Sequence, residues 1–226
     1  MERRVIEDFT LSLSFEEVAK RLLLEEEEDK ALMRDRYDTA MALARPKGVY
    51  VVQPVTAIEE DLVTIGDTVF HSHVMARNLQ GVERVCAYVV TCGREVDDWS
   101  HEEADPIVGL WLDMLKEMIL GQAMGQFFTK LAHEQHLERY ATMSPGSGNL
   151  DVWPIQQQRP LFDLIGRVEE DTGARLTPSY LMLPTKSGSG ILYPSEKGFI
   201  TCTLCSRTHC PNRRAPYDPT ASEQLM

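Results

Sequence analysis

The sequence is short of positive charge, of long apolar runs and of cysteine, and each shortage excludes a class of protein. Lys and Arg number 23 against 35 Asp and Glu, which gives a formal net charge of −12. An acidic chain is a poor general binder of nucleic acid, because phosphate binding depends on clustered Lys and Arg. Charged residues interrupt every apolar stretch well before the roughly 18 residues of a membrane-spanning helix. We therefore expect neither nucleic acid nor membrane among the partners.

Cysteine usage and the N-terminal residues indicate the compartment. The five cysteines are an odd number and do not suggest a disulfide scaffold. The stretch MERRVIEDF lacks the apolar core of a signal peptide, so we expect a cytoplasmic protein. The 226 residues are 43% hydrophobic and 26% charged, which is ordinary for a globular protein with a substantial core.

The usual catalytic and nucleotide-binding motifs are also missing. The sequence has no G-x-x-x-x-G-K-[ST] loop and no G-x-G-x-x-G after a strand. His133 and His136 lie three residues apart around Glu134, whereas a zinc protease needs two histidines four apart on one helix face. Neither paired carboxylates nor a Ser-His-Asp arrangement stands out. No catalytic residue is predicted, and whether the chain is an enzyme stays open.

Helical patterns dominate the first 45 residues and a central stretch. Ser14 is a plausible N-cap with Glu17 three residues later, as in a capping box, and a second helix ends near Pro46. Pro106 can open the longest helix, which we expect to run to about Tyr140. Its apolar residues at helical spacing predict one buried stripe made of Ile107, Leu110, Trp111, Met114, Leu115, Met118 and Ile119.

Short stretches rich in Val, Ile, Thr and Tyr predict strands over 49–55, 61–65, 67–72 and 84–93. Residues 160–173 predict a short helix with Gly173 as its C-cap. The KSGSG stretch (186–190) suits either a close backbone approach to a ligand or, as we favour from the residues alone, a flexible hairpin.

These patterns predict both helices and strands, in one large domain or two small ones.

Three motifs, in matching order and spacing, carry a resemblance to a known family. YVVTCGREVDDW (88–99) reads Val-Thr-x-Gly-x-x-x-Asp, and PLFDLIGRVEEDTG is similar to the helix before the third motif. That motif, ARLTPSYLMLPTKSGSGILYP (174–194), has a Leu-Thr-x-Ser start, a Met-x-Pro step and a Ser-x-Ser-Gly segment. Together they resemble the reactivation domain of cobalamin-dependent methionine synthase over roughly residues 84–201. The matching residues are Val90, Thr91, Gly93, Asp97, Leu176, Thr177, Ser179, Met182, Pro184, Ser187, Ser189 and Gly190.

The resemblance implies a single α+β domain with a twisted antiparallel sheet flanked by helices. We expect it to cover residues 1–226, with a helical part at 1–46, an α+β body at 47–201, a cysteine-containing segment at 202–214 and a polar tail at 215–226. In that family the domain binds S-adenosylmethionine and docks on the corrinoid-carrying domain during reductive methylation, which rescues cob(II)alamin. This chain would be a stand-alone homologue that assists a corrinoid-binding protein or methyltransferase. Alternatives are a docking module that does not bind S-adenosylmethionine and a small iron–sulfur or zinc protein. The cofactor-binding residues that the resemblance implies are Pro145, Gly146, Lys186, Ser187, Ser189, Gly190 and Tyr193.

One loop departs from the family pattern. The family reads R-x-x-x-G-Y-P-A-C-P ahead of the short helix, whereas this chain reads SPGSGN over 144–149, with Ser147 where tyrosine is usual. Simpler stand-alone relatives carry an S-P-G-Y-G-x-W-like loop followed by glutamine, which Ser144, Pro145, Gly146, Gly148, Trp153 and one of residues 156–158 match. A neutral loop cannot supply the charge-assisted contact that a methionine carboxylate takes from arginine. Lys186 is the candidate to replace it.

A C-x2-C-x4-C cluster stands outside the resemblance. Cys202 and Cys205 can both reach one metal ion from a tight turn, and Cys210 can supply a third ligand. A fourth ligand could be His209, Cys86, Cys92 or a group from another molecule. An iron–sulfur cluster, zinc, a redox disulfide and three plain reduced cysteines all remain open. We expect the segment to continue the strand that follows KSGSG.

Overall fold

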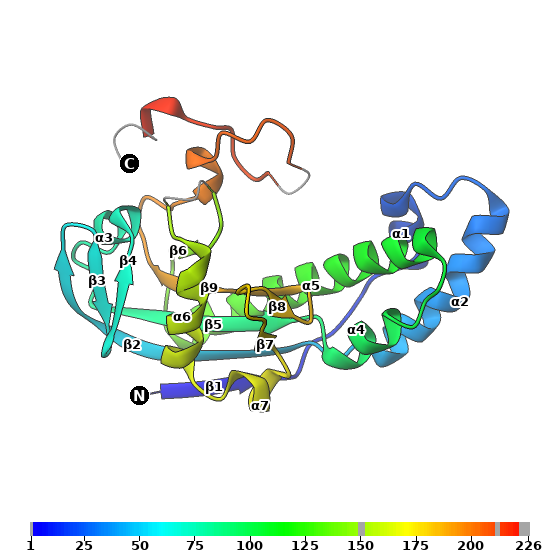
Figure 1. The fold of residues 1–226 in the computed structure, drawn as a ribbon, viewed down its shortest axis with the longest axis horizontal. Helices are drawn as coiled ribbons and strands as arrows, with labels where there is room; N and C mark the ends of the chain where they lie inside the picture. Colours follow the sequence, from blue (N-terminus) through cyan, green and yellow to red (C-terminus); the bar gives the residue numbers. More distant parts are fainter. Residues whose placement is uncertain (1, 149–151, 211–212, 222–226) are drawn as a thin grey trace.

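A seven-stranded antiparallel sheet forms the body of the protein in a computed structural model that describes residues 2–148, 152–210 and 213–221. The strand order is β4-β3-β2-β5-β9-β6, and β1 also pairs with β2 (Figure 1). A separate two-stranded hairpin, β7–β8, lies beside it. The strands are β1 (Glu2–Ile6), β2 (Lys47–Glu59), β3 (Leu62–Ile65), β4 (Thr68–His71), β5 (Arg84–Thr91), β6 (Tyr140–Met143), β7 (Arg175–Leu176), β8 (Met182–Leu183) and β9 (Ser187–Pro194).

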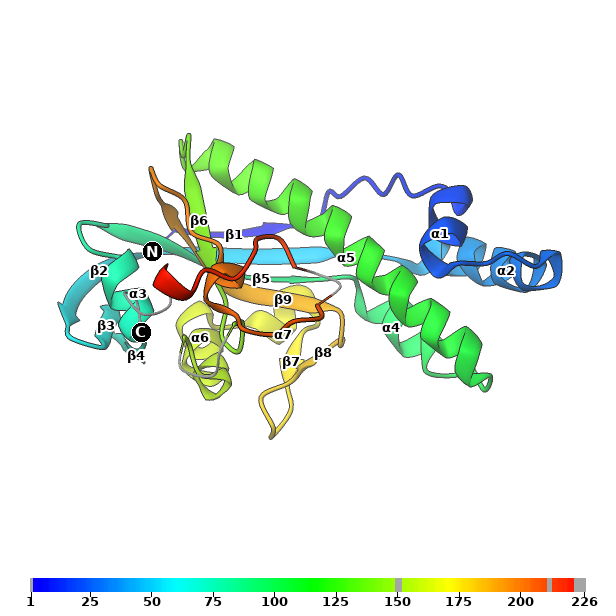
Figure 2. The same ribbon diagram turned by 90° about the horizontal axis from the view of Figure 1, so that it is seen from above.

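Helices cover both faces of the sheet and extend beyond it as an arm (Figures 1 and 2). They are α1 (Phe15–Leu22), α2 (Glu27–Leu43), α3 (His73–Asn78), α4 (Arg94–Ser100), α5 (Pro106–Glu134), α6 (Gln158–Ile165) and α7 (Val168–Thr172), with 3-10 turns η1 (Ile155–Gln157) and η2 (Thr201–Leu204). The predicted α+β class with an antiparallel sheet and flanking helices is confirmed. Among these described helices, none is long and apolar enough to cross a membrane.

Strand β5 shows why the sheet needs cover on both sides. Seven of its eight residues are buried. Val89 belongs to a core shared with α6 and α7, and the next residue, Val90, belongs to a core shared with α5. Neighbouring side chains on a strand alternate between faces, so a strand buried on both faces reads as a continuous apolar run.

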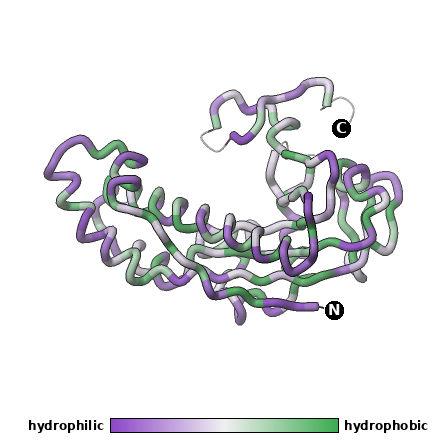
Figure 3. Tube along the Cα trace, turned by 180° about the vertical axis from the view of Figure 1, so that it is seen from behind, coloured by the Kyte–Doolittle hydropathy of each residue, from purple (hydrophilic) through white to green (hydrophobic). Residues whose placement is uncertain are grey.

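The helical arm has a core of its own. Helices α1, α2 and α4 pack on the first half of α5 around buried residues such as Val18, Met33 and Leu112. The capping box predicted at Ser14 and Glu17 is confirmed. The acidic run that follows α1 lies at the outer end of the arm, which is coloured as hydrophilic in Figure 3.

Residues 2–6 are a strand, not part of a helical segment as the sequence suggested. They pair with Gly48–Val52, on the same edge of β2 that β3 uses further along. Arg3 ties strand β1 to the end of α6, because its guanidinium group donates to the carbonyls of Ile165 (2.5 Å) and Gly166 (2.9 Å). These partners lie more than 160 residues away, so tertiary pairing overrides the local helical pattern.

The predicted apolar stripe of α5 was wrong in part. Ile107 and Leu110 are 61% and 60% exposed, whereas Leu115 and Ile119 are buried as expected. The residues that α5 buries are Val108, Leu112, Leu115, Lys116, Ile119, Ala123, Phe127, Leu131 and Ala132. The helix begins at Pro106 as predicted but ends at Glu134, because the chain then turns into β6.

The predictions for residues 160–173 and for KSGSG were wrong in part. The short helix expected over 160–173 is two helices, broken where Gly166 and Arg167 take positive φ angles of 64° and 48°. Its C-cap is confirmed, because Gly173 has a φ of 76° and its N–H donates to the carbonyl of Glu169. KSGSG is not a flexible hairpin: Ser187 opens β9, which lies between β5 and β6.

Candidate functional site

A cavity of about 400 Å³ opens where the start of β9 meets the loop after β6, η1 and the tip of the β7–β8 hairpin. Its volume lies in the range of small-molecule sites. Among the residues that the structure describes, none that lines the cavity carries a charge, and most of the lining surface is apolar. The lining residues are Ser144, Pro145, Ile155, Gln158, Tyr180, Leu181, Met182, Thr185, Ser187, Gly188 and Ser189.

Three of the predicted cofactor-binding residues line this cavity. Pro145 comes from the SPG loop, and Ser187 and Ser189 come from β9. The Ser189 hydroxyl donates to Oε1 of Gln158 (3.0 Å), and both side chains are buried. The Ser187 hydroxyl donates to the carbonyl of Pro184 (2.7 Å). The structure thus brings together the SPG and SGSG motifs, which lie about forty residues apart in the chain.

Gly190 does not line the cavity. A glycine is needed at this position because the backbone of the neighbouring strand lies too close for a side chain. A Cβ at Gly190 would lie 2.1 Å from the carbonyl oxygen of Met143 on β6. No side chain fits at this distance, so glycine lets β6 and β9 pair closely. This pairing places Ser144 and Pro145, the first residues after β6, at the cavity.

Gly146 shapes the loop next to the cavity. Its φ of 75° favours glycine, and a Cβ there would lie 2.7 Å from Cδ1 of Ile155. Its N–H donates to the carbonyl of Trp153 (2.7 Å). The loop predicted over 144–149 is described as far as Gly148, and Asn149 lies outside the described residues.

The Leu-Thr-x-Ser segment builds the hairpin that covers one side of the cavity. Thr177 accepts the N–H of Leu181 at its hydroxyl (3.1 Å) and donates its own N–H to the Leu181 carbonyl (2.8 Å). Tyr180 takes a φ of 64°, which brings Tyr180 and Leu181 to the tip. Leu181 is 60% exposed. The sequence analysis did not predict that Tyr180 and Leu181 line a site. The signal that could have indicated them is an apolar residue, Leu181, in an otherwise polar turn.

Lys186 precedes Ser187 in the chain, but its side chain contacts helix α5 and does not line the cavity. Its ammonium group is 3.6 Å from Asp113 on α5. Asp113 also contacts Lys116 (3.0 Å), which is buried and bonds Asp97 at 2.7 Å. The four residues form a chain of alternating charge. It links Asp97 of the Val-Thr-x-Gly-x-x-x-Asp motif to the segment before β9.

The other residues of that first motif have structural roles. The hydroxyl of Thr91 accepts the N–H of Gly93 (3.3 Å). A Cβ at Gly93 would lie 2.8 Å from the backbone of Arg45, and its φ is 109°. The motif therefore makes a tight passage from β5 into α4, and none of its residues lines the cavity.

Tyr193 does not reach the cavity. Its side chain is 1% exposed and packs in the core beneath α6. Burial raises the pKa of Tyr193. Among the described residues, its hydroxyl has no hydrogen-bond partner. Alternation along β9 explains the placement, because positions 191 and 193 face the same core.

The cysteine-containing segment does not continue β9, contrary to our expectation. The strand ends at Pro194, and a loop leads to the 3-10 turn η2 on the β6 side of the sheet (Figures 1 and 2). Cys202 and Cys205 lie on this turn. Within the described ranges, no group of three or more His, Cys, Asp and Glu side chains is arranged to hold a metal ion. The metal site predicted at Cys202, Cys205 and Cys210 therefore stays a prediction.

The five free thiols fall into two environments. Cys86 and Cys92 are buried, and burial raises the pKa of each thiol to about 12. Cys202, Cys205 and Cys210 are half-buried. Burial acts to raise the pKa of Cys202, but the backbone N–H groups of Arg214 and Ala215 and the charge of Arg214 outweigh it and lower that pKa.

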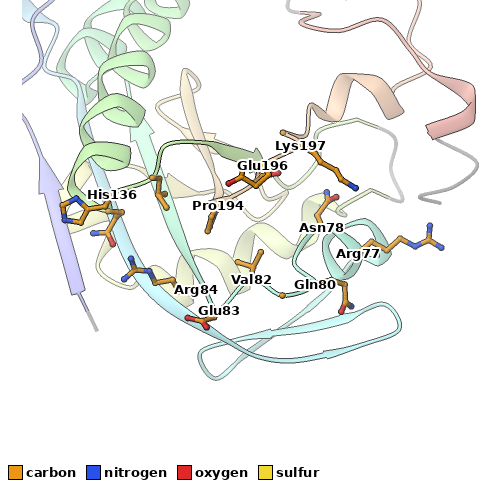
Figure 4. Close-up of a pocket in the computed structure, with 15 residues that line it drawn as sticks. Arg77, Asn78, Gln80, Val82, Glu83, Arg84, His136, Pro194, Glu196 and Lys197 are labelled. Atoms are coloured by element: carbon orange, nitrogen blue, oxygen red, sulfur yellow. The ribbon is translucent and has the colours of Figure 1, made fainter.

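A larger cavity, about 840 Å³, lies at the opposite end of β9 (Figure 4). It is lined by charges of both signs, including Arg84 and Glu196. Figure 4 shows Arg77 and Arg84 on opposite sides of it, so these two guanidinium groups do not converge on one point. None of the predicted site residues lines it. The smaller cavity is therefore the candidate functional site.

Comparison with known proteins supports the fold. No family model and no curated protein matches the sequence. Thirteen chains of solved structures match significantly. One is the crystal structure of the MetH reactivation domain bound to AdoHcy, with a TM-score of 0.59 and 18% sequence identity over 89% of this chain and 81% of that chain. This chain shares the fold of that reactivation domain. At this level of identity the likeness concerns the fold and assigns no ligand to the cavity.

Proposed function

We propose that this protein is a counterpart of the methionine synthase reactivation domain. It binds S-adenosylmethionine in the cavity beside Pro145 and Ser189 and assists the reductive methylation of a corrinoid held by a partner protein. The observation that carries this proposal is the shared fold with a domain that binds AdoHcy, extending over 89% of this chain. It gains support from the SPG and SGSG motifs, which meet at one cavity.

The cavity suits the apolar and polar parts of an adenosyl ligand. Ile155, Leu181 and Met182 offer apolar contact for an adenine ring, and Tyr180 adds an aromatic side chain. Ser187 and Ser189 line the cavity, and because their hydroxyl groups already donate to Pro184 and Gln158, they offer oxygen acceptors to a ligand. A few polar groups in an apolar pocket are typical of sites that orient a small molecule.

The amino-acid end of the ligand needs a charged partner. The lining described here is uncharged, so the carboxylate has to be met from the rim. Lys186 precedes Ser187, and its side chain is 24% exposed. Its 3.6 Å contact with Asp113 is longer than a charge-assisted hydrogen bond, so the carboxylate of a ligand can compete with Asp113 for the ammonium group. This lysine replaces the arginine of the family loop in our proposal.

The protein supplies position rather than acid or base groups. S-adenosylmethionine, when bound, supplies the methyl group. The chain holds it in the cavity, which reaches the protein surface beside the 60% exposed Leu181. Placing two reactants in contact can account for much of the acceleration of a transfer reaction.

Calorimetry tests the binding step. We expect S-adenosylhomocysteine and S-adenosylmethionine to bind the full chain with one site. Ser187→Leu narrows the cavity and should abolish binding. Ser195→Leu, the same change beyond the end of β9, should leave it intact. Loss of binding in both variants, or in neither, would contradict the assigned site.

A spectroscopic assay tests the function itself. The protein is mixed with a cob(II)alamin-loaded corrinoid domain, a reductant and S-adenosylmethionine, and the visible spectrum is followed. We expect conversion to methylcobalamin only when all components are present. An unchanged visible spectrum with every corrinoid partner tried would contradict the proposed function.

A second candidate is a docking module that binds the corrinoid partner without S-adenosylmethionine. The uncharged lining of the cavity favours it, because the ligand would lose the charge-assisted contact of the family. This candidate predicts no heat with either adenosyl compound but stable association with a corrinoid domain in size-exclusion chromatography. Heat in calorimetry decides against it.

A further inference from the structure

Cys202 and Cys205 form a fixed pair at the surface. Both thiols are free and half-buried, in contrast to the buried Cys86 and Cys92. Between the pair, Leu204 is fully buried in the main core and anchors the turn. The two thiols therefore stand on a turn that is tied to the body of the protein, within reach of a small molecule.

The backbone brings the two cysteines close together. The N–H of Cys205 donates to the carbonyl of Cys202 (3.2 Å), which closes a four-residue turn. In such a turn the first and last Cα atoms lie within about 7 Å. A disulfide requires a Cα separation of roughly 4.4–6.8 Å. Cys205 is also the C-cap of η2, with φ −99° and ψ 114°, so its side chain is free of helical constraint.

Arg213 clamps this turn. Its guanidinium group donates to the carbonyls of Cys202 (3.2 Å), Cys205 (3.1 Å) and Ala215 (3.0 Å) and also bonds the carbonyl of Arg207. The backbone N–H of Arg214 lies 3.5 Å from Sγ of Cys202. One arginine thus holds both cysteines in register, next to a donor that stabilises a thiolate.

We propose that Cys202 and Cys205 are a redox-active dithiol that closes to a disulfide by exchange with a low-molecular-weight disulfide. A thiolate of the pair attacks the oxidant, forms a mixed disulfide and releases one thiol. The second thiolate of the pair then displaces the other half of the oxidant and forms the Cys202–Cys205 bond. The pair loses two electrons and two protons, and the oxidant takes up both as two thiols.

The site is independent of the proposed corrinoid function. The two cysteines nevertheless lie near the candidate cavity, as the packing of the residue before Cys202 shows. A Cβ on Gly148, in the loop after β6, would lie 2.7 Å from Cγ2 of Thr201, the residue before Cys202. The turn that carries the dithiol therefore packs against the loop that supplies Pro145.

Mass spectrometry of the oxidised full chain tests this inference. The protein is incubated with glutathione disulfide, blocked with N-ethylmaleimide and cut with trypsin. Cleavage after Lys197 and Arg207 places Cys202 and Cys205 in one peptide and Cys210 in the next. We expect the first peptide to lose two hydrogen atoms and take no maleimide, while the Cys210 peptide takes one. Dithiothreitol should reverse the change.

Single variants separate the pair from its neighbour. Cys202→Ser and Cys205→Ser should each trap a glutathione adduct on the remaining cysteine of the turn, and Cys210→Ser should still form the internal bond. Three outcomes would overturn the inference: adducts on all three cysteines without an internal bond, a bond that requires Cys210, or tightly bound zinc in the purified chain that is lost in Cys202→Ser.

Discussion

The ammonium group of Lys116 lies 2.7 Å from a carboxylate oxygen of Asp97, and both side chains are almost fully buried. The same ammonium group donates to the hydroxyl of Ser100 (2.7 Å). Burial acts to lower the pKa of Lys116, but Asp97 and Asp113 outweigh it and raise that pKa. The lysine is therefore a charged structural element at the junction of α4 and α5.

Removing this lysine is expected to destabilise the fold strongly. Lys116→Met leaves the carboxylate of Asp97 buried without its counter-ion, at a cost of about 3–5 kcal/mol in the free energy of unfolding. Urea unfolding measures the change. Lys30→Met is the control, because Lys30 pairs with the exposed Glu27 and its loss should cost about 0–1 kcal/mol. Equal effects of the two variants would contradict a buried pair.

Asp113 is expected to make stability depend on acid pH. Burial acts to raise its pKa, but Lys116 and then Lys186 outweigh it and hold the pKa below the ordinary 3.8. A carboxylate with a lowered folded pKa stabilises above its unfolded pKa, and this contribution is lost as the pH falls through the folded value. Asp113→Asn should be less stable than the native chain at neutral pH, with a difference that shrinks from about pH 5 to about pH 2. A difference in urea midpoint that stays constant over this range would refute the assignment.

Gly190→Ala is expected to separate β6 from β9. The new Cβ would meet the carbonyl oxygen of Met143 at 2.1 Å, and a backbone atom cannot move aside as a side chain can. We expect a loss of at least about 1–3 kcal/mol and loss of ligand binding. Gly125→Ala is the matched control, since nothing lies within 4 Å of its Cβ position on α5. That change should stabilise the helix by about 0.5–1 kcal/mol, as measured by thermal unfolding.

Lys186→Met is expected to weaken S-adenosylhomocysteine binding without loss of the fold. Removal of one charge-assisted hydrogen bond should lower affinity roughly tenfold or more. Lys197→Met provides the control, because Lys197 lines the other cavity. Calorimetry measures both. Unchanged affinity in Lys186→Met would mean that another cation meets the carboxylate.

Arg213→Gln is expected to loosen the turn that carries Cys202 and Cys205. The amide N–H of Cys205, which bonds the Cys202 carbonyl, should exchange with solvent about tenfold faster when the guanidinium clamp is lost. Arg207→Gln, at an exposed side chain, is the control. Hydrogen exchange read by mass spectrometry gives the comparison, and equal rates in all three proteins would argue against the clamp.

The sequence by itself determined the element types and the fold class. The capping box at Ser14, the C-cap at Gly173 and the buried strand predicted over 84–93 depend on local chemistry, and the structure has all three, with the strand ending at Thr91. The three family motifs also predicted the α+β fold, which the structural comparison confirms. Local periodicity, capping and turn chemistry act between near neighbours, so the chain alone carries them.

Only the tertiary structure decided which faces are covered and where charges meet. Residues 2–6 became a strand because an edge of β2 was free to pair with them. The first half of α5 is apolar on more than one side, so the packing of α1, α2 and α4 chose its buried face and left Ile107 exposed. Lys186 meets Asp113 rather than open solvent, because α5 crosses the start of β9. Such contacts join residues dozens of positions apart, and no local pattern encodes them.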